Sequence, residues 1–291
     1  MKKTVILFII AIMLSSFLLY GCSAMKGVNV GGVDLTPLAS AGEKLSQKGE
    51  TPENEEVVIG GHMAGTLLGA SKLDQKVNTQ RYVNRVGRWL SLHCSRPNLP
   101  WRFGVLADND LNAFAAPGGY VFITRGLLNI LDNEAELAGV LSHEMGHVNC
   151  KHYLAAVHSN NLVGAAMDVG LFLGDAATSG SASAQQREFG QKVVNASREV
   201  YAKGLDKDDE YEADLEALKL MTAAGYDPYA YVAVIQKIEA RSANDSGLAL
   251  LLQTHPRPED RLDEMDEALS DMALSQNPAT LKDRFRNELK R

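Results

Sequence analysis

Length, composition and charge narrow the function before any motif is considered. The chain has 291 residues, of which 45% are hydrophobic, and this is enough for one sizeable globular domain or two small ones. It carries 36 acidic and 29 basic residues, so its formal net charge is −7. Because no basic stripe balances the acids, nucleic acid is not expected as a partner.

The N-terminus has the features of a secretory signal peptide over residues 1–21. Residues 1–3 supply a positive start, residues 4–20 are almost wholly apolar, and Gly21 precedes Cys22. This order is typical of a signal peptide that ends at a small residue. The apolar run is short for a transmembrane helix, which needs about 20 residues. The alternative is an uncleaved N-terminal anchor helix with an incidental cysteine.

Residues 22–52 are expected to be a flexible tether, and residues 53–291 to be the folded domain. The tether is rich in Gly, Ser, Ala and Lys and lacks helical periodicity. In the domain, Cys94 and Cys150 are the only cysteines. In an oxidising compartment they could form one disulfide, and the sequence leaves this open against two buried free thiols.

The first half of the domain predicts two helices and two short strands. A helical pattern starts at Glu53 and breaks near Gly69, and a second covers residues 76–93. Branched and aromatic residues predict strands at 101–107 and 120–124. The connection between these strands, residues 108–119, contains Asp, Asn, Pro and a Gly-Gly pair, and is expected to form turns.

After Gly126 the patterns are helical. Apolar residues at helical spacing predict a helix over 133–150, and others start near residues 206, 226, 258 and 278. The segment 174–184 consists of small residues that cannot build a core, and it is expected to be a mobile loop. The predicted fold class is α+β, mostly helical, with a small β-sheet beside the 133–150 helix.

The strongest chemical signal is the sequence His143-Glu144-Met145-Gly146-His147. Histidines at positions i and i+4 lie on one face of a helix, so both imidazoles can reach one metal ion. Glu144 cannot ligate with them but can contact a water on the open side of the metal. The alternative is a pair of surface histidines beside an ordinary glutamate, although unpaired imidazoles on so apolar a helix would need partners.

A catalytic zinc takes three protein ligands and keeps one position for water, so a third ligand must come from elsewhere. Glu210 and Asp214 share one face of a later helix, and they could supply that ligand and a carboxylate for a ligand histidine. Glu212 is a rival ligand. The stretch 206–214 could also be only an acidic helix start, which the helix dipole favours.

Four motifs in order resemble one family of metallopeptidases. They are residues 143–147 (HEMGH), residues 210–214 (EYEAD), Thr254-His255-Pro256 with Arg261, and residues 112–119 (NAFAAPGG). Together they resemble the gluzincin metallopeptidases of the HtpX and CAAX-prenyl-protease family, and within it the periplasmic lipoprotein branch that is LoiP- and BepA-like. The resemblance runs from about residue 53 to residue 269, and it implies a mostly helical gluzincin fold.

The resemblance also implies roles for individual residues. It selects Glu210 over Glu212 as the third ligand of one zinc ion per chain, and it places His255 and Arg261 near that metal. It implies that the strand after the Gly-Gly pair is an edge strand that holds extended substrate by β-augmentation. The expected substrate-binding residues are Asn112, Gly119, Tyr120, Val121 and Phe122.

The residues around Cys22 resemble a bacterial lipobox, Leu19-x-Gly21-Cys22. The resemblance implies that Cys22 is lipidated and that the protein is anchored in the bacterial cell envelope. Ser23 after the cysteine implies the outer membrane, with the domain facing the periplasm. Relatives with a helical-repeat domain carry it after the protease, and only 36 residues follow His255, so no such domain is expected.

The expected activity is a zinc-dependent endopeptidase that acts on unfolded or misassembled envelope proteins. Glu144 would serve as the catalytic base, and His255 or Arg261 would stabilise the oxyanion. Arg261 could instead be an ion-pair partner of the acids at 206–214. The remaining histidines have no catalytic role assigned: His152 and His158 are expected to be surface or structural residues, and His62 and His93 carry no motif.

A second hypothesis belongs to another class of protein. The chain could be a periplasmic chaperone or assembly factor whose zinc site is latched and rarely catalytic. His255 could fill the open zinc position, and the 174–184 segment could cover the cleft.

Overall fold

The computed structural model describes residues 29–30, 33–34, 51–159, 184–241, 248–255 and 258–289. The chain divides into two compact units, Met1–Thr51 and Pro52–Arg291. In the first, β1 (Asn29–Val30) pairs antiparallel with β2 (Val33–Asp34). The predicted signal peptide, Cys22 and nearly all of the 174–184 segment lie outside the described residues.

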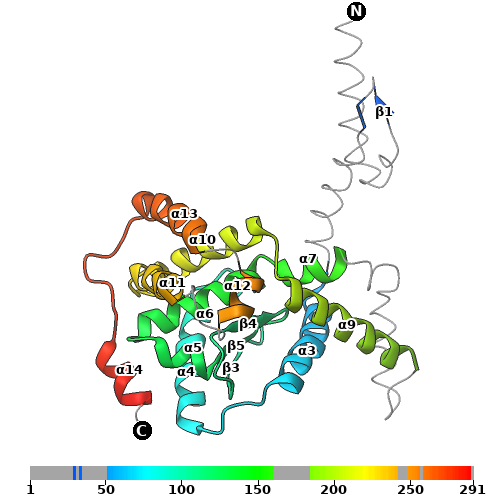
Figure 1. The fold of residues 1–291 in the computed structure, drawn as a ribbon, viewed down its shortest axis with the longest axis horizontal. Helices are drawn as coiled ribbons and strands as arrows, with labels where there is room; N and C mark the ends of the chain where they lie inside the picture. The colour runs from blue at the N-terminus through cyan, green and yellow to red at the C-terminus, as the bar shows by residue number, and fades with distance from the viewer. Residues whose placement is uncertain are drawn as a thin grey trace, which may run out of the picture. The chain divides into compact units, whose positions relative to one another are not determined.

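The second unit opens with two helices that lead into a small sheet (Figure 1). The helices are α3 (Glu53–Ala70) and α4 (Val77–Ser91), and the strands are β3 (Arg102–Leu106), β4 (Ala113–Ala116) and β5 (Tyr120–Thr124). The strand order is β3-β5-β4, with β5 parallel to β3 and antiparallel to β4. The predicted strands at 101–107 and 120–124 are therefore present.

Strand β4 corrects the sequence-based prediction for the 108–119 connection. That connection contains four residues, Ala113-Phe114-Ala115-Ala116, that pair with β5 from Ala113 opposite Ile123 to Ala116 opposite Tyr120. This alanine-rich segment has no β-branched residues that would predict a strand. Its strand conformation is stabilised by pairing with β5 and by burial. The remainder of the connection does form turns, as predicted.

The turn between β4 and β5 depends on its two glycines. Gly118 and Gly119 have φ angles of 74° and 91°, which side-chain-bearing residues rarely adopt. A Cβ atom on Gly118 would also lie 2.6 Å from Cα of Val57 in α3. This pair therefore lets the hairpin close tightly and lets α3 approach it.

The described remainder of the unit is mostly helical, which confirms the predicted α+β class. The helices are α5 (Arg125–Ile130), α6 (Glu134–Asn149), α7 (His152–Ser159), α9 (Ala184–Lys203), α10 (Lys207–Ala223), α11 (Tyr229–Arg241), α12 (Ala249–Thr254), α13 (Pro258–Asp271) and α14 (Lys282–Leu289). Within the described ranges, no helix is both long and apolar enough to span a membrane.

Helix α6 lies at the centre of the core. The Asn133 side chain caps its N-terminus by accepting from the Glu136 backbone N–H at 3.0 Å, and every residue from Glu134 to Val148 is buried. Helices α10, α11 and α4 and strand β4 pack around it. A helix that is buried on all sides has no polar face, so its charged residues need internal partners.

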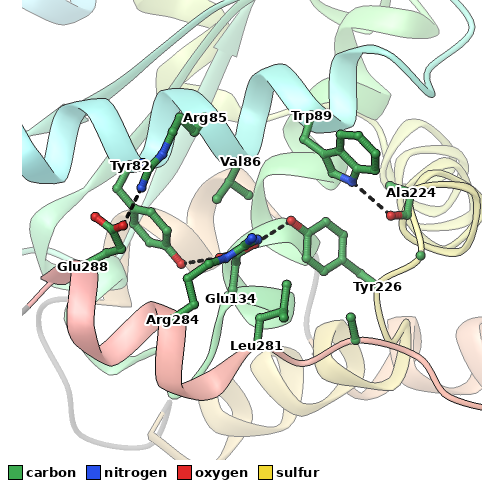
Figure 2. A pocket seen from close by; sticks show the side chains of 12 residues that line it. Tyr82, Arg85, Val86, Trp89, Glu134, Ala224, Tyr226, Leu281, Arg284 and Glu288 are labelled. Atoms are coloured by element: carbon green, nitrogen blue, oxygen red, sulfur yellow. Dashed lines mark hydrogen bonds and ion pairs between the residues drawn. The ribbon is translucent and has the colours of Figure 1, made fainter.

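One such partner system joins α14 to the N-terminal end of α6 (Figure 2). The buried Glu134 carboxylate accepts from the hydroxyls of Tyr82 and Tyr226, at 2.7 Å each, and from the guanidinium of Arg284. These side chains border a cavity of about 510 Å³ between α4 and α14. Burial alone would raise the pKa of Glu134, but the hydrogen bonds from Arg284 and the tyrosines outweigh it and lower the pKa.

The candidate disulfide between Cys94 and Cys150 is not formed. Cys94 follows α4, and its thiol donates to the Ser91 carbonyl at 3.3 Å. Cys150 is the C-terminal cap of α6. Both thiols are half-buried.

Arg284→Ala should lower the free energy of unfolding by about 1–2 kcal/mol, because Glu134 keeps its two tyrosine donors but loses its only paired cation in the described structure. Folding lowers the pKa of Glu134, so its ionised form stabilises the fold at pH values above those at which glutamate side chains ordinarily titrate. The difference in the free energy of unfolding between variant and wild type should therefore shrink as the pH falls below those values. Urea unfolding from pH 3 to pH 7 measures this, with exposed Arg286→Ala as the control. A pH-independent difference would contradict the ion pair.

Candidate metal centre

Three side chains from two helices converge on one point. His143 and His147 come from α6, and Glu210 comes from the first turn of α10. The two Nε2 atoms are 3.1 Å apart, and the Glu210 oxygens lie 3.5 Å from His143 Nε2 and 3.4 Å from His147 Nε2. A tetrahedral metal with bonds of about 2.0–2.2 Å holds its ligand atoms about 3.3–3.6 Å apart. The side chains therefore already have the spacing of a metal site.

The close approach of α10 to α6 makes this convergence possible. A Cβ atom on Gly146 would lie 2.9 Å from the Ala213 carbonyl oxygen, so the glycine within the HEMGH sequence lets the two backbones meet. Gly139 plays the same part toward α11, because a Cβ there would lie 2.7 Å from Cβ of Tyr231. Any side chain at position 146 would push Glu210 away from the two histidines.

The unpaired atoms of the site fit a metal and a water. The side-chain oxygen Oε1 of Glu210 is buried and has no hydrogen-bond partner among the described residues, and the same is true of Oε2 of Glu144. A buried polar atom without a partner costs free energy unless a ligand satisfies it. Burial lowers the pKa of His147, which favours the neutral imidazole that a metal needs.

Glu144 lies beside the three ligands and has the environment of a general base. It is almost fully buried, and burial raises the pKa of its carboxyl. A cavity of about 30 Å³, lined among others by His143, Glu144 and Ala113, has room for about one water. A carboxylate whose pKa is raised toward neutrality, next to such a water, can take its proton.

Asp214 holds His143 in place. Its Oδ1 lies 2.9 Å from His143 Nδ1, so the imidazole can donate there while Nε2 points at the other ligands. Burial alone would raise the pKa of Asp214, but the charge of Arg261 outweighs it and holds the pKa well below its usual range. The carboxylate therefore stays ionised and keeps the His143 tautomer that a metal at Nε2 requires.

Arg261 is the ion-pair partner of Asp214. Its Nε donates to Asp214 Oδ2 at 2.8 Å, and one NH₂ group reaches Asp214 Oδ1 at 2.5 Å and the Tyr231 hydroxyl at 2.6 Å. Because these hydrogen bonds hold the guanidinium against Asp214, Arg261 forms an ion pair with an acid of the 206–214 segment. These contacts favour the alternative assignment of Arg261, an ion-pair partner, over the expected role as an oxyanion donor.

The structure assigns Glu212 to a different histidine. His152 is fully buried; its Nδ1 lies 2.9 Å from His147 Nδ1, and its Nε2 lies 3.0 Å from Glu212 Oε2. Glu212 is therefore not a ligand of the His143–His147 pair, and His152 is a buried side chain. Its contact with a ligand histidine was not predicted, because only the fold brings α7 and α10 together.

His255 reaches the same centre from the end of α12. Its Nδ1 lies 2.6 Å from Glu210 Oε2, and its donor atom belongs to one group with those of His143, His147 and Glu210, all within 4.8 Å of one another. At 2.6 Å the contact with Glu210 is a hydrogen bond and shorter than the spacing of two ligands on one metal. His255 can therefore bond to Glu210 or, after a small shift, contact the metal.

The prediction that the strand after the Gly-Gly pair is an edge strand is wrong. Strand β5, which contains Tyr120, Val121 and Phe122, is the central strand of the sheet, because β3 and β4 occupy both of its edges. Gly119 serves the β4–β5 turn. The edge beside the metal centre belongs to β4, whose first residue, Ala113, lines the cavity next to Glu144. Asn112 is buried just before it.

Glu210→Gln should weaken metal binding by more than about 100-fold, because a neutral amide replaces the only charged ligand of the set, and even outer partners of a metal ligand are worth about 10–100-fold. Zinc affinity in competition with a chelator measures this. Glu216→Gln on the same helix is the control, and Glu144→Gln should bind as tightly as wild type. Unchanged affinity in Glu210→Gln would contradict the assignment.

Arg261→Ala should lower the free energy of unfolding by about 3–5 kcal/mol, because it leaves the buried Asp214 carboxylate without its cation. Denaturant unfolding measures this, with Arg241→Ala at the exposed end of α11 as the control. If stability matched the wild type, the positioning role of the pair would be refuted.

Comparison with known proteins agrees with this geometry. Residues 77–269 match the model of Peptidase family M48. The beta-barrel assembly-enhancing protease of Yersinia pestis is 29% identical over 259 residues, which are 87% of this chain and 51% of that protein. The mitochondrial metalloendopeptidase OMA1 of Schizosaccharomyces pombe is 30% identical over 193 residues, 66% of this chain and 53% of that protein.

The metalloprotease YcaL of Escherichia coli is 28% identical over 227 residues, 77% of this chain and 82% of that protein. The chain spans about half the length of the beta-barrel assembly-enhancing proteases that it matches. The matched region contains α6, α10 and the start of α13, and hence every residue of the metal centre. The resemblance inferred from the four motifs is confirmed, and the chain belongs to peptidase family M48.

Proposed function

We propose that the chain is a zinc-dependent endopeptidase that cleaves unfolded or misassembled proteins of the bacterial cell envelope. The observation that carries the proposal is the set of His143, His147 and Glu210 at ligand spacing, with the unpaired carboxylate oxygen of Glu144 beside it. Two imidazoles and one carboxylate form a common ligand set of catalytic zinc. The names of the relatives support an envelope substrate for this chain.

The residues divide the chemistry among them. Zinc bound by the three ligands would supply a Lewis acid that polarises the peptide carbonyl and lowers the pKa of a bound water. Glu144 takes the proton of the attacking water and passes it to the leaving nitrogen. With Arg261 committed to Asp214, His255 is the side chain placed to donate to the developing oxyanion.

The substrate is proposed to bind as an extended strand along β4. Ala113 lies at the cavity beside Glu144, and adding a strand at this edge would bring a peptide bond next to the base. Further along β4, the Ala115 carbonyl accepts from the Tyr201 hydroxyl of α9 at 2.8 Å. An incoming strand that uses Ala115 would have to replace this bond.

The proposed location follows from the N-terminal segment. A lipid on Cys22, after removal of residues 1–21, would anchor the domain at the outer membrane facing the periplasm. The sequence Leu19-x-Gly21-Cys22 and the following Ser23 support this. Such an anchor would hold the metal centre near newly exported envelope proteins.

A second candidate function, a chaperone or assembly factor with a latched zinc site, is favoured by one feature. The short bond from His255 to Glu210 and the cavity of about 30 Å³ leave room for a water but not for a peptide. In this form the site opens only when His255 moves away.

Glu144→Gln should abolish hydrolysis of an unfolded protein such as casein while leaving zinc affinity unchanged, because it removes the base and none of the ligands. The expected loss in kcat is about 10²–10⁴-fold, the usual share of a general base. Peptide release from casein, measured beside the zinc content of both proteins, tests this. If both proteins cleaved casein equally, the endopeptidase proposal would be wrong.

His255→Ala distinguishes the two candidate functions. If His255 donates to the oxyanion, kcat should fall by about 10²–10³-fold. If it latches the site, casein hydrolysis should rise above that of the wild type. Initial rates at saturating casein show whether kcat falls or rises. A rise in kcat would refute the donor role of His255 and favour the latched form.

A further inference from the structure

A second cluster of metal-ligating side chains lies beside the catalytic centre and shares no residue with it. The thiol of Cys150, the imidazole of His152 and the carboxylate of Glu212 place one ligand atom each within 4.8 Å of one another. The catalytic group uses His143, His147, Glu210 and His255. Sequence analysis assigned no metal to the second cluster.

The turn between α6 and α7 brings Cys150 and His152 together. Cys150 caps the C-terminus of α6, and His152 is the first residue of α7. Lys151 between them has a φ of 60°, in the left-handed region that residues other than glycine seldom adopt. This sharp turn leaves only two residues, Cys150 and Lys151, between the two helices and holds the thiol and the imidazole against the start of α10.

Helix α10 supplies oxygen ligands for the same place. Glu212 Oε2 lies 3.0 Å from His152 Nε2, and Asp209 Oδ1 lies 3.6 Å from the same nitrogen. The Glu212 contact is a hydrogen bond, and a tetrahedral metal with bonds of about 2.0–2.2 Å would space its two atoms by about 3.3–3.6 Å after a small shift of the carboxylate. Two acids next to this imidazole also give the cluster the negative charge that attracts a cation.

We propose that Cys150, His152 and Glu212 form a second site for a divalent transition metal. One sulfur, one nitrogen and one oxygen suit Zn²⁺ or Co²⁺ and disfavour Mg²⁺ and Ca²⁺, which require oxygen ligands. On binding, the metal replaces the thiol proton of Cys150, which passes to solvent, and it takes Nε2 of a neutral His152, whose single ring proton then lies on Nδ1.

The site is expected to act against the catalytic one. With a metal on His147 Nε2, the ring proton of His147 would lie on Nδ1 and could be donated to His152 Nδ1, 2.9 Å away. A metal on His152 Nε2 leaves the remaining imidazole proton on Nδ1, where it faces that of His147. The two protons repel, so filling the second site should weaken the hold on the catalytic metal.

Cobalt titration tests the site directly, because a thiolate bound to Co²⁺ gives a charge-transfer band in the near ultraviolet and the catalytic site contains no sulfur. The purified full chain, kept reduced, should show no such band with the first equivalent, which fills the buried preformed site. The band should grow with the second equivalent. It should vanish in Cys150→Ser and persist in Cys94→Ser and Cys22→Ser, which remove the other two thiols.

Glu212→Gln provides an independent variant, because its side chain is half exposed and its loss should not disturb folding. The variant should bind the second equivalent of cobalt about tenfold or more weakly, and its affinity for the first equivalent should be unchanged. A wild type without the thiolate band at two equivalents would overturn the second site. So would a band that survives Cys150→Ser.

The antagonism rests on the proposed peptidase function and has its own test. Excess zinc should inhibit casein hydrolysis by the wild type and inhibit Cys150→Ser at least about tenfold less strongly. Equal inhibition of both proteins would refute the antagonism, and a wild type that never cleaves casein would refute the peptidase function. The cobalt band does not depend on activity, so it stays decisive for the site itself.

Discussion

The close contact between α6 and α10 creates the metal centre and also buries its charges. Gly146 lets the Ala213 backbone approach, and this brings the Glu210 carboxylate to two histidines in a fully buried place. Ionised groups in such surroundings are costly unless they are paired. The structure meets this requirement for Asp214 with Arg261, and for Glu210 with the histidines around it.

Asp214 and His143 are thus each held by a neighbour from a different helix. Asp214 on α10 orients His143 on α6, and Arg261 on α13 keeps Asp214 ionised. The Tyr231 hydroxyl on α11 donates to the same carboxylate at 2.8 Å. These contacts hold the two imidazoles with Nε2 directed to one point, so a metal finds its ligands already in position.

Much of this arrangement could be predicted from the sequence where spacing along one helix determines geometry. The i, i+4 positions of His143 and His147 predicted a shared face, and in the structure their Nε2 atoms lie 3.1 Å apart. The distance between Glu210 and these histidines depends on how two helices pack, so spacing alone could not separate Glu210 from Glu212. The resemblance to a known family was needed there.

Contacts that exist only in the folded chain could not be predicted. Strand β4 has no β-branched residues, so nothing in its sequence indicated that it would take the sheet edge expected of β5. Tyr231 carries no motif and joins the centre only because α11 packs against Gly139. His152 carries no motif, and it contacts His147 only because the turn at Lys151 places the two imidazoles side by side.

The central claim is that two histidines and one glutamate of this chain hold a metal. The X-ray absorption spectrum of the protein with one equivalent of zinc tests it most directly. The proposed centre predicts imidazole nitrogens and oxygens at about 2.0–2.1 Å and no sulfur neighbour. A sulfur neighbour at about 2.3 Å in that sample, or a spectrum without imidazole, would contradict it.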